Sequence, residues 1–500
     1  MAVAKSQILT AMMIAGVSFS VFAQDSQMVG SPGTDTAKPT IAEVEEKYSY
    51  NPYDRDFWSE VKTAMADNDS ARVVRLGVER FTSFAGLTSA EGAEGQVAVA
   101  EGLLALGYPY AATYLFKELA LKQNGSRFGE AGLEGLSRIV AHFDHDESEI
   151  SDLLVSTDFG PLHKGVQSFV SFHRAIYNLQ FGLNKWSEKE WVQVPDDSFW
   201  GLKKKYFLAL SEIEKGQVDQ AIARLEGLLK VKEFDGPLKA QVALQLSRLY
   251  FEKGQLKEAL AITENQNYSQ REVGRLKLET AWVKYYLKSY SEALGILEGL
   301  KSPYYSPSWH PEAFILEMLI YKDLCYFDKV SEISSQFKKR FNPSLMQIRR
   351  RLPLGEDPLL VNMVLVKRKY QALANFLNSI EKERESIFGY SWMDSEMLSV
   401  LKDEYDRKVQ DLRTRLDRAM VTEAAKQAEL LLDFEEQVKF LEYFSNLEAL
   451  RVTNDKGPDF ASDKISKFNF NQVVWPVQGE YWLDELGQYK VLVSSQCGQR

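Results

Sequence analysis

The sequence predicts an all-α protein built from stacked helix pairs. From about Asp54 to Arg451 apolar residues recur three and four positions apart, as on one face of a helix, and the alternation typical of strands does not persist. A short turn motif also recurs along the chain. The composition, 45% hydrophobic and 26% charged, is globular and excludes a disordered, collagen-like or multi-span membrane chain. A net charge of −10 argues against nucleic-acid binding by the chain as a whole.

The N-terminus is typical of an export signal. Lys5 precedes an apolar run from Ile8 to Phe22, and the run ends in small or β-branched residues at the positions that signal peptidase reads. We interpret 1–23 as a signal peptide cleaved before Gln24, with an uncleaved anchor as the alternative. The run is shorter and more polar than the ~20 apolar residues of a spanning helix. No cysteine lies near the cleavage site, so the mature chain is expected in the periplasm or outside the cell, without a lipid anchor or a transmembrane span.

Two segments precede the clearest repeats. Residues 24–47 are small, polar and interrupted by prolines, which predicts a flexible leader. Residues 52–201 are expected to hold degenerate helical repeats. Gly107 and Gly216 both begin the recurring turn and lie 216 − 107 = 109 residues apart, or three steps of about 36, which leaves room for two further hairpins in between.

The clearest repeats occupy 202–344. A turn residue stands five positions before a small alanine in Gly216–Ala221, Gly254–Ala259 and Lys288–Ala293, and Cys325–Val330 is a looser copy. Successive small residues are 259 − 221 = 38, 293 − 259 = 34 and 330 − 293 = 37 positions apart, the period of helix-turn-helix repeats. Glycine permits the left-handed turn, and a small residue lets two helices cross closely. The predicted packing positions are Leu246, Ser247, Tyr250, Gly254, Ala259, Ala281, Tyr290 and Ala293.

These residues resemble the tetratricopeptide repeat (TPR). The resemblance is specific over about 202–344 and moderate at 93–126, and it departs from the family pattern at Thr263 and Gln266. It implies a TPR-like α-solenoid of hairpins whose first helices line a concave groove for a protein or an extended peptide. The predicted lining positions in that groove are Arg248, Lys284 and Tyr285.

The chain after the repeats is predicted to form long amphipathic helices over 359–451. Apolar residues dominate a stripe from Leu401 to Leu441, which Glu423 and Gln427 interrupt. Such a helix either packs along the repeats of its own chain or pairs with another chain as a coiled coil, so self-association through 395–445 stays open.

Residues 454–500 form an aromatic tail. The run from Trp475 to Tyr489 resembles the closing segment of some secreted TPR proteins of gliding and predatory bacteria, which implies an envelope role. The tail is expected either to cover an exposed apolar end of the helices or to recognise a partner. Cys325 and Cys497, the two cysteines of the chain, either form a disulfide or remain unpaired.

The candidate chemical groups favour no reaction. His142, Asp144, His145, Asp146 and Glu147 lie close together and would suit a divalent metal, but an acidic turn between helices explains them equally, and we expect neither metal nor cofactor. The other three histidines, His163, His173 and His310, are expected at helix caps and core edges.

Two short segments echo lytic transglycosylases. Glu385-Ser-Ile-Phe388 and Ser344-Leu-Met-Gln347 are similar to the catalytic pieces of those enzymes, but they occur in reverse order and Ser344 replaces a glycine. A glycosidase acid needs a pocket that raises its pKa. Glu385 lies in a charged run, so a solvated helix face is expected.

Six basic residues with no acid among them gather near the end of the repeats: Lys338, Lys339, Arg340, Arg349, Arg350 and Arg351. Such a segment attracts anions, for example a carboxylated glycan, a lipid phosphate or an acidic protein. The alternative is a solvated helix end, where the helix dipole favours positive charge.

The sequence therefore predicts an exported, non-enzymatic scaffold that binds protein or peptide partners in assembly of a cell-envelope machine, in motility, secretion or wall maintenance. The alternative is a peptidoglycan-active enzyme, similar to a lytic transglycosylase, that carries a helical platform.

Overall fold

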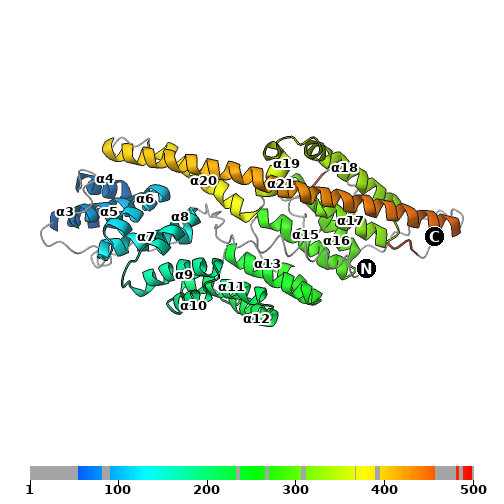
Figure 1. The fold of residues 1–500 in the computed structure, drawn as a ribbon, viewed down its shortest axis with the longest axis horizontal. Helices are drawn as coiled ribbons and strands as arrows, with labels where there is room; N and C mark the ends of the chain where they lie inside the picture. The colour runs from blue at the N-terminus through cyan, green and yellow to red at the C-terminus, as the bar shows by residue number, and fades with distance from the viewer. Residues whose placement is uncertain are drawn as a thin grey trace. The chain divides into compact units, whose positions relative to one another are not determined.

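The described part of the chain is all-α, as predicted (Figure 1). The computed structural model describes residues 55–80, 90–231, 237–264, 270–305, 311–365, 367–388, 395–455, 480–482 and 488–497. These residues hold nineteen α-helices and no strand. Successive helices pack as pairs, and the chain divides into two compact units. None of the described helices is long and apolar enough to cross a membrane. The predicted export signal and leader, with Gln266 and His310, lie outside the described residues.

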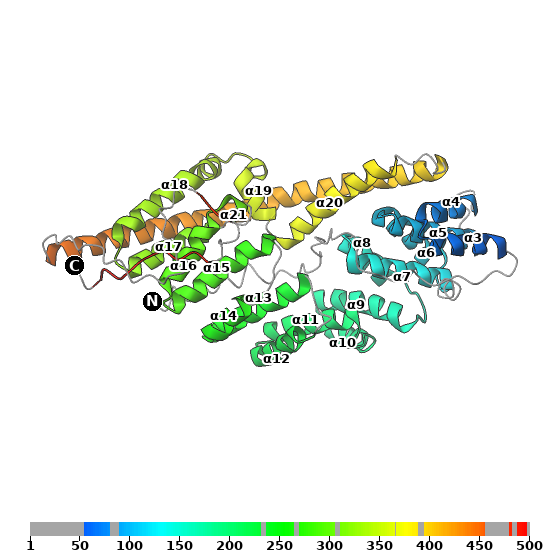
Figure 2. The same cartoon turned by 180° about the vertical axis from the view of Figure 1, so that it is seen from behind.

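The first unit comprises residues up to Phe207 together with 368–416. Its helices are α3 (Arg55–Ala66), α4 (Ser70–Arg80), α5 (Ala90–Ala105), α6 (Pro109–Lys122), α7 (Arg127–His142), α8 (Glu147–Ser156), α9 (Lys164–Gln180), α10 (Asn184–Val192), the start of α11 (Phe199–Glu214), α20 (Arg368–Ile387) and the start of α21 (Ser395–Asp455). Helix α20 lies beside this part of α21 (Figure 2), and Arg413 on α21 donates to Glu381 on α20 at 3.1 Å.

The second unit comprises residues 208–367 and 417–500. Beside the ends of α11 and α21 it contains α12 (Val218–Leu229), α13 (Pro237–Glu252), α14 (Leu256–Glu264), α15 (Gln270–Tyr286), α16 (Tyr290–Leu300), α17 (Glu312–Asp323), α18 (Phe327–Arg349) and α19 (Pro358–Leu365), with two short 3₁₀ helices. Helix α18 continues through Pro343. Phe337, Phe341 and Leu345 lie buried along one face of it, and this burial outweighs the hydrogen bond that proline cannot make.

The same turn joins the helices of seven described pairs. The turn residues have φ between +62° and +85°, and each amide bonds the carbonyl three residues back while the next amide bonds the carbonyl five residues before it. This is the Schellman motif. Glycine fits the left-handed conformation without strain, and Asn68, Lys288 and Cys325 adopt it as non-glycine residues. The seven turn residues are Asn68, Gly107, Gly182, Gly216, Gly254, Lys288 and Cys325.

A small or β-branched side chain is buried five residues after each turn. These residues are Val73, Ala112, Ser187, Ala221, Ala259, Ala293 and Val330. In the best unit, the Ser247 hydroxyl donates to the carbonyl oxygen of Ala259 at 3.1 Å, which brings α13 and α14 into close contact. Leu246 and Ala281 are also fully buried, while Tyr250 and Tyr290 are half-buried.

The apolar stripe of α21 packs within the chain. Five residues of the stripe, Leu401, Tyr405, Leu412, Leu431 and Val438, are buried, each within the unit to which it belongs. Glu423 and Gln427, which interrupt the stripe in sequence, are also buried. The carboxylate of Glu423 accepts from Lys367 at 2.9 Å, so an ion pair replaces apolar contact there. Self-association through 395–445 stays a prediction.

Candidate functional site

Four alternate helices line a cavity of about 610 Å³ in the first unit. Helices α5, α7, α9 and α11 provide its walls. The volume lies within the range of small-ligand pockets. The apolar lining is Val97, Phe128, Val166, Phe199 and Trp200, and the charged lining includes Glu94, Arg127, Glu130, Glu134 and Arg138. We call this cavity the groove.

Helix caps hold the groove walls in place. The Ser198 hydroxyl accepts from the amide of Gly201 at 2.9 Å, which starts α11 and positions Phe199 and Trp200. The Trp200 indole donates to the hydroxyl of Ser137 on α7 at 3.2 Å. Glu130 on α7 accepts from the amide of His163, the residue before α9, at 2.6 Å. A carboxylate on α7 therefore caps the start of α9.

Glycines allow α7 to approach α6 on the side away from the groove. A Cβ at Gly132 would lie 2.6 Å from the carbonyl oxygen of Phe116, and a Cβ at Gly135 would lie 2.5 Å from the Phe116 ring. Real Cβ atoms essentially never make contacts this short. Alanine at either position would therefore push α7 and its groove-lining side chains out of place.

A histidine–carboxylate cluster lies beside Trp200, one of the groove residues. His145 Nε2 and His173 Nδ1 each lie 3.1 Å from the Glu147 carboxylate, and the His173 ring packs edge-on against Phe169 and Trp200. Burial alone would raise the pKa of Glu147, but charge attraction and hydrogen bonding from the two histidines hold that pKa below its usual range. His163 is exposed at the start of α9.

The acidic run at 144–149 is split between two environments. Glu147 faces the buried histidines, whereas Asp146 caps α8 and pairs with Lys408 and Arg415 of α21, with Lys408 Nζ at 2.6 Å. Burial works to raise the pKa of Asp146, yet these ion pairs hold it below its usual range. Among the described residues no group of three or more His, Cys, Asp or Glu side chains is arranged to hold a metal ion.

A second buried carboxylate ties α20 to the hairpins of the first unit. Glu383 accepts from the amides of Tyr110 at 3.0 Å and Ala111 at 2.9 Å, so it caps α6, whose own cap residue Tyr108 makes no side-chain cap. The hydroxyl of Tyr405 on α21 also donates to Glu383, at 2.6 Å. Burial raises the pKa of Glu383 to about 7, although these hydrogen bonds favour the ionised form.

The predicted groove residues of the second unit join neighbouring hairpins. Arg248 on α13 donates to Glu279 on α15, with its Nε at 3.1 Å. Lys284 pairs with Glu264 at 2.8 Å and with Glu292 at 2.9 Å. The Tyr285 hydroxyl donates to Asp323 on α17 at 3.0 Å. These three side chains do not line the groove described above, and binding of a partner by them stays a prediction.

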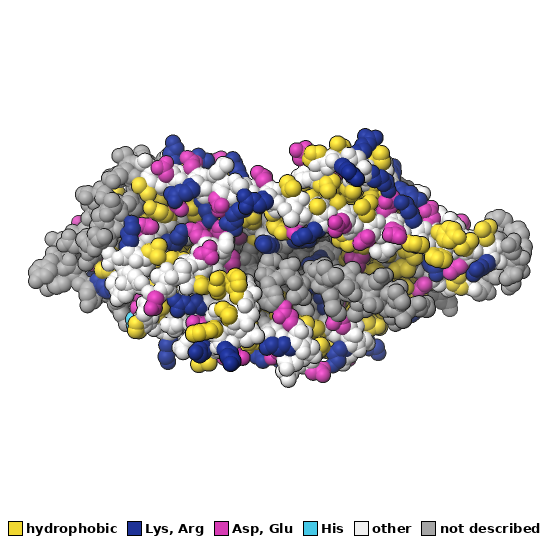
Figure 3. All heavy atoms as spheres, in the orientation of Figure 1, with side chains coloured by type: hydrophobic (Ala, Val, Ile, Leu, Met, Phe, Trp, Pro, Cys, Tyr) yellow, Lys and Arg dark blue, Asp and Glu magenta, His cyan; other side chains and the backbone are white. Residues whose placement is uncertain are grey.

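The predicted basic segment forms the C-terminal half of α18 and the turn after it. Lys338 pairs with Glu442 at 2.7 Å and Arg349 with Glu435 at 2.6 Å, both acids on α21. Lys339, Arg340, Arg350 and Arg351 are exposed. On the visible face of the described residues, basic and acidic side chains are interspersed (Figure 3).

The two segments that echo lytic transglycosylases fall in different units. Glu385 is exposed on α20, two residues after the buried Glu383. Ser344 is buried on α18 and bonds the Asp357 carboxylate at 3.0 Å. The Glu385 environment is therefore the solvated helix face that its charged neighbours predict.

The fold defines an all-helical protein of stacked helix pairs. Compared with models of known protein families, the sequence matches none, and it shows no significant similarity to a curated protein. The functional assignment therefore depends on the groove and the surfaces described above.

Proposed function

We propose that the chain is an exported, non-enzymatic TPR-like scaffold that binds protein or extended-peptide partners in assembly of a cell-envelope machine. The observation that carries this proposal is the groove, because its walls are alternate helices along the chain, α5, α7, α9 and α11. Its mixed apolar and charged lining suits a peptide that anchors a large apolar side chain and carries polar groups beside it.

Two further observations support export of the chain to the cell envelope. The N-terminal residues have the pattern of an export signal. The Cys325–Cys497 disulfide is consistent with an oxidising compartment such as the periplasm. Cell fractionation and the N-terminal mass of the purified chain test this part, since export predicts a mature chain that begins at Gln24.

A pair of matched substitutions tests the groove. Phe199 lines it and is 42% exposed, whereas Phe181 is 64% exposed and lies outside it. A photo-reactive phenylalanine at position 199 should give partner adducts in cells, and the same residue at position 181 should give none. Peptides selected on the purified chain should lose at least about tenfold in affinity with Phe199→Ala, because one buried aromatic contact is worth about 1.4 kcal/mol or more.

The opposite results exclude the proposal. Adducts at both positions, or peptides insensitive to Phe199→Ala, would place partner binding elsewhere. Release of soluble muropeptides from cell-wall sacculi by the wild-type chain, but not by Glu385→Gln, would favour the enzyme instead.

The exposed part of the basic segment supports a proposed contact with an anionic glycan or lipid. Binding of the chain to sacculi or to anionic vesicles should weaken with salt and with Lys339→Glu. Binding that is unchanged by both would remove this contact.

A further inference from the structure

The described end of the tail is held along α16 and reaches the end of α17. The amide of Val491 donates to the carbonyl oxygen of Ser291 at 3.1 Å, and the Ser291 hydroxyl donates back to the carbonyl oxygen of Val491 at 2.6 Å. Further along, the amide of Gln496 donates to the carbonyl oxygen of Leu324 at 3.0 Å. The tail therefore binds as an extended peptide, through its backbone. We call its seat on α16 and α17 the strip.

The strip has the shape and charge of a peptide site. Gly295 leaves room for the tail, because a Cβ there would lie 1.7 Å from the carbonyl oxygen of Tyr489. The atoms nearest to that Cβ all belong to Tyr489 and Lys490. Lys490 pairs with Glu292 at 2.9 Å, and the Tyr489 ring is buried. A glycine slot, an acid for a lysine and a place for an aromatic ring together specify this segment.

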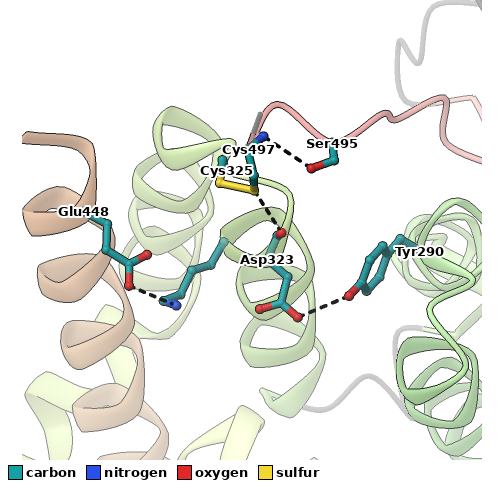
Figure 4. The surroundings of a disulfide bond; sticks show 7 residues. Tyr290, Asp323, Cys325, Glu448, Ser495 and Cys497 are labelled. Carbon is teal, nitrogen blue, oxygen red and sulfur yellow. Dashed lines mark hydrogen bonds and ion pairs between the residues drawn. A yellow bond between two sulfur atoms is a disulfide. The ribbon is translucent and has the colours of Figure 1, made fainter. Parts of the chain in front are cut away.

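One covalent bond closes the strip. Figure 4 shows the Cys325–Cys497 disulfide above Asp323, with Ser495 beside it. Cys325 occupies the turn between α17 and α18, while Cys497 is exposed and so open to attack by a thiolate. A dithiol reductant would attack Cys497, form a mixed disulfide and then close its own disulfide. In total the reductant would supply two electrons and two protons, and Cys325 and Cys497 would become thiols.

We propose that the strip is an exchangeable peptide-binding surface, in which the tail of a second copy of this chain takes the place of the chain's own tail once the disulfide is reduced. Reoxidation then links the two chains through Cys325 of one and Cys497 of the other. A second copy is the occupant because its residues 488–497 carry the same complement to Gly295, Glu292 and Ser291. Exchange of an identical element is a low-cost route to a dimer.

The chain length permits this exchange. Residues 456–479 separate the end of α21 from the described tail, and their contour spans up to ~80 Å at about 3.4 Å per residue. The chain's own tail competes for the strip with the tails of other chains, and because it is tethered its effective concentration is on the order of 1 mM. At roughly 0.1 mM protein, about a tenth of the strips would therefore hold a tail from another chain at equilibrium, and disulfide formation would trap them.

Two complementary full-length variants test the proposal. One carries Cys325→Ser and a first tag, and the other carries Cys497→Ser and a second tag. The pair is mixed with reduced and oxidised glutathione. Oxidised glutathione accepts the two electrons and is reduced as the bond forms. The expected product on a non-reducing gel is a heterodimer that joins Cys497 of the first chain to Cys325 of the second.

Matched glycine substitutions test whether the heterodimer forms through binding of the tail to the strip. Gly295→Leu in the Cys325-bearing chain should lower the heterodimer yield about tenfold, because the leucine fills the slot under Tyr489. Gly227→Leu on α12 is the control, since nothing lies within 4 Å of a Cβ there. Both variants should keep the wild-type helical circular dichroism. The proposal is overturned if no heterodimer forms, if its yield only equals that of each variant's own homodimer, or if Gly295→Leu leaves the yield unchanged.

Discussion

Replacing Glu383 by glutamine tests whether a buried carboxyl group fastens α20 to the hairpins of the first unit. Its pKa is about 7 in the folded chain, against an ordinary value of 4.5. A carboxyl group with a raised folded pKa stabilises the fold fully below its unfolded pKa and loses that contribution as the pH rises through the folded value. The rise of this pKa from 4.5 to about 7 corresponds to about 3 kcal/mol of stability, of which about 2.5 kcal/mol is lost between pH 5 and pH 8.

Glutamine does not titrate, so the Glu383→Gln chain should lack this loss. The free energy of unfolding of the variant, relative to the wild type, should rise by about 2.5 kcal/mol from pH 5 to pH 8. Urea unfolding followed by circular dichroism measures the difference, and hydrogen exchange at the start of α6 locates it. Glu385→Gln makes the same change on the exposed face of α20 and should shift stability by less than about 0.5 kcal/mol at both pH values. A pH-independent difference between Glu383→Gln and the wild type would refute the reasoning.

Three further changes test other parts of the fold. Ala259→Leu should separate α13 from α14 and lower stability by about 1–3 kcal/mol in thermal melts, whereas Ala223→Leu, exposed on α12, should be near neutral; equal effects would contradict the packing argument. Lys408→Met removes the cation shared by the buried Asp146 and the half-buried Glu149, which keep Arg415 and Lys117 as partners, so it should cost about 1–3 kcal/mol in urea unfolding; a cost below about 0.5 kcal/mol would show that the shared cation is dispensable. Burial raises the pKa of Glu312 to about 7, and the Glu312 carboxylate accepts a hydrogen bond from the Trp282 indole at 2.8 Å. The tryptophan fluorescence of the wild type should therefore change with a midpoint near pH 7. If Glu312→Gln shows the same titration, the fluorescence change belongs to another group.

The turns show how much of the fold the sequence predicts. Gly216 and Gly254 signal the left-handed turn directly, and Lys288 and Cys325 were found because the small residue five positions later keeps its place. The equivalent turn at Asn68 was missed because neither Asn68 nor Val73, five positions later, matches the glycine and alanine of the clearest copies, and because it lies outside the stretch 202–344 whose period places Cys325 and Val330. Local chemistry therefore specifies the hairpins even where one half of the motif changes.

The candidate site was less predictable, because its contacts join distant parts of the sequence. Glu383 looks like one more charge in a charged run, and its partners Tyr110 and Ala111 lie more than 270 positions away. The close contact between α7 and α6 could have been predicted from the sequence, because glycines at 129, 132 and 135 recur every three residues and so lie on one face of α7. The glycine face of α7 packs against α6, and the opposite face of α7 lines the groove.

The Asp146–Arg415 ion pair has a consequence for how the chain matures. Asp146 and Arg415 are separated by 269 positions, so the part of α21 that holds Arg415 leaves the ribosome long after the hairpins that it contacts. Until that late segment arrives, the hairpins lack a cover for side chains such as Tyr110, and contacts of such long range form slowly. Fragments that stop before residue 395 should therefore depend on chaperones to stay out of aggregates.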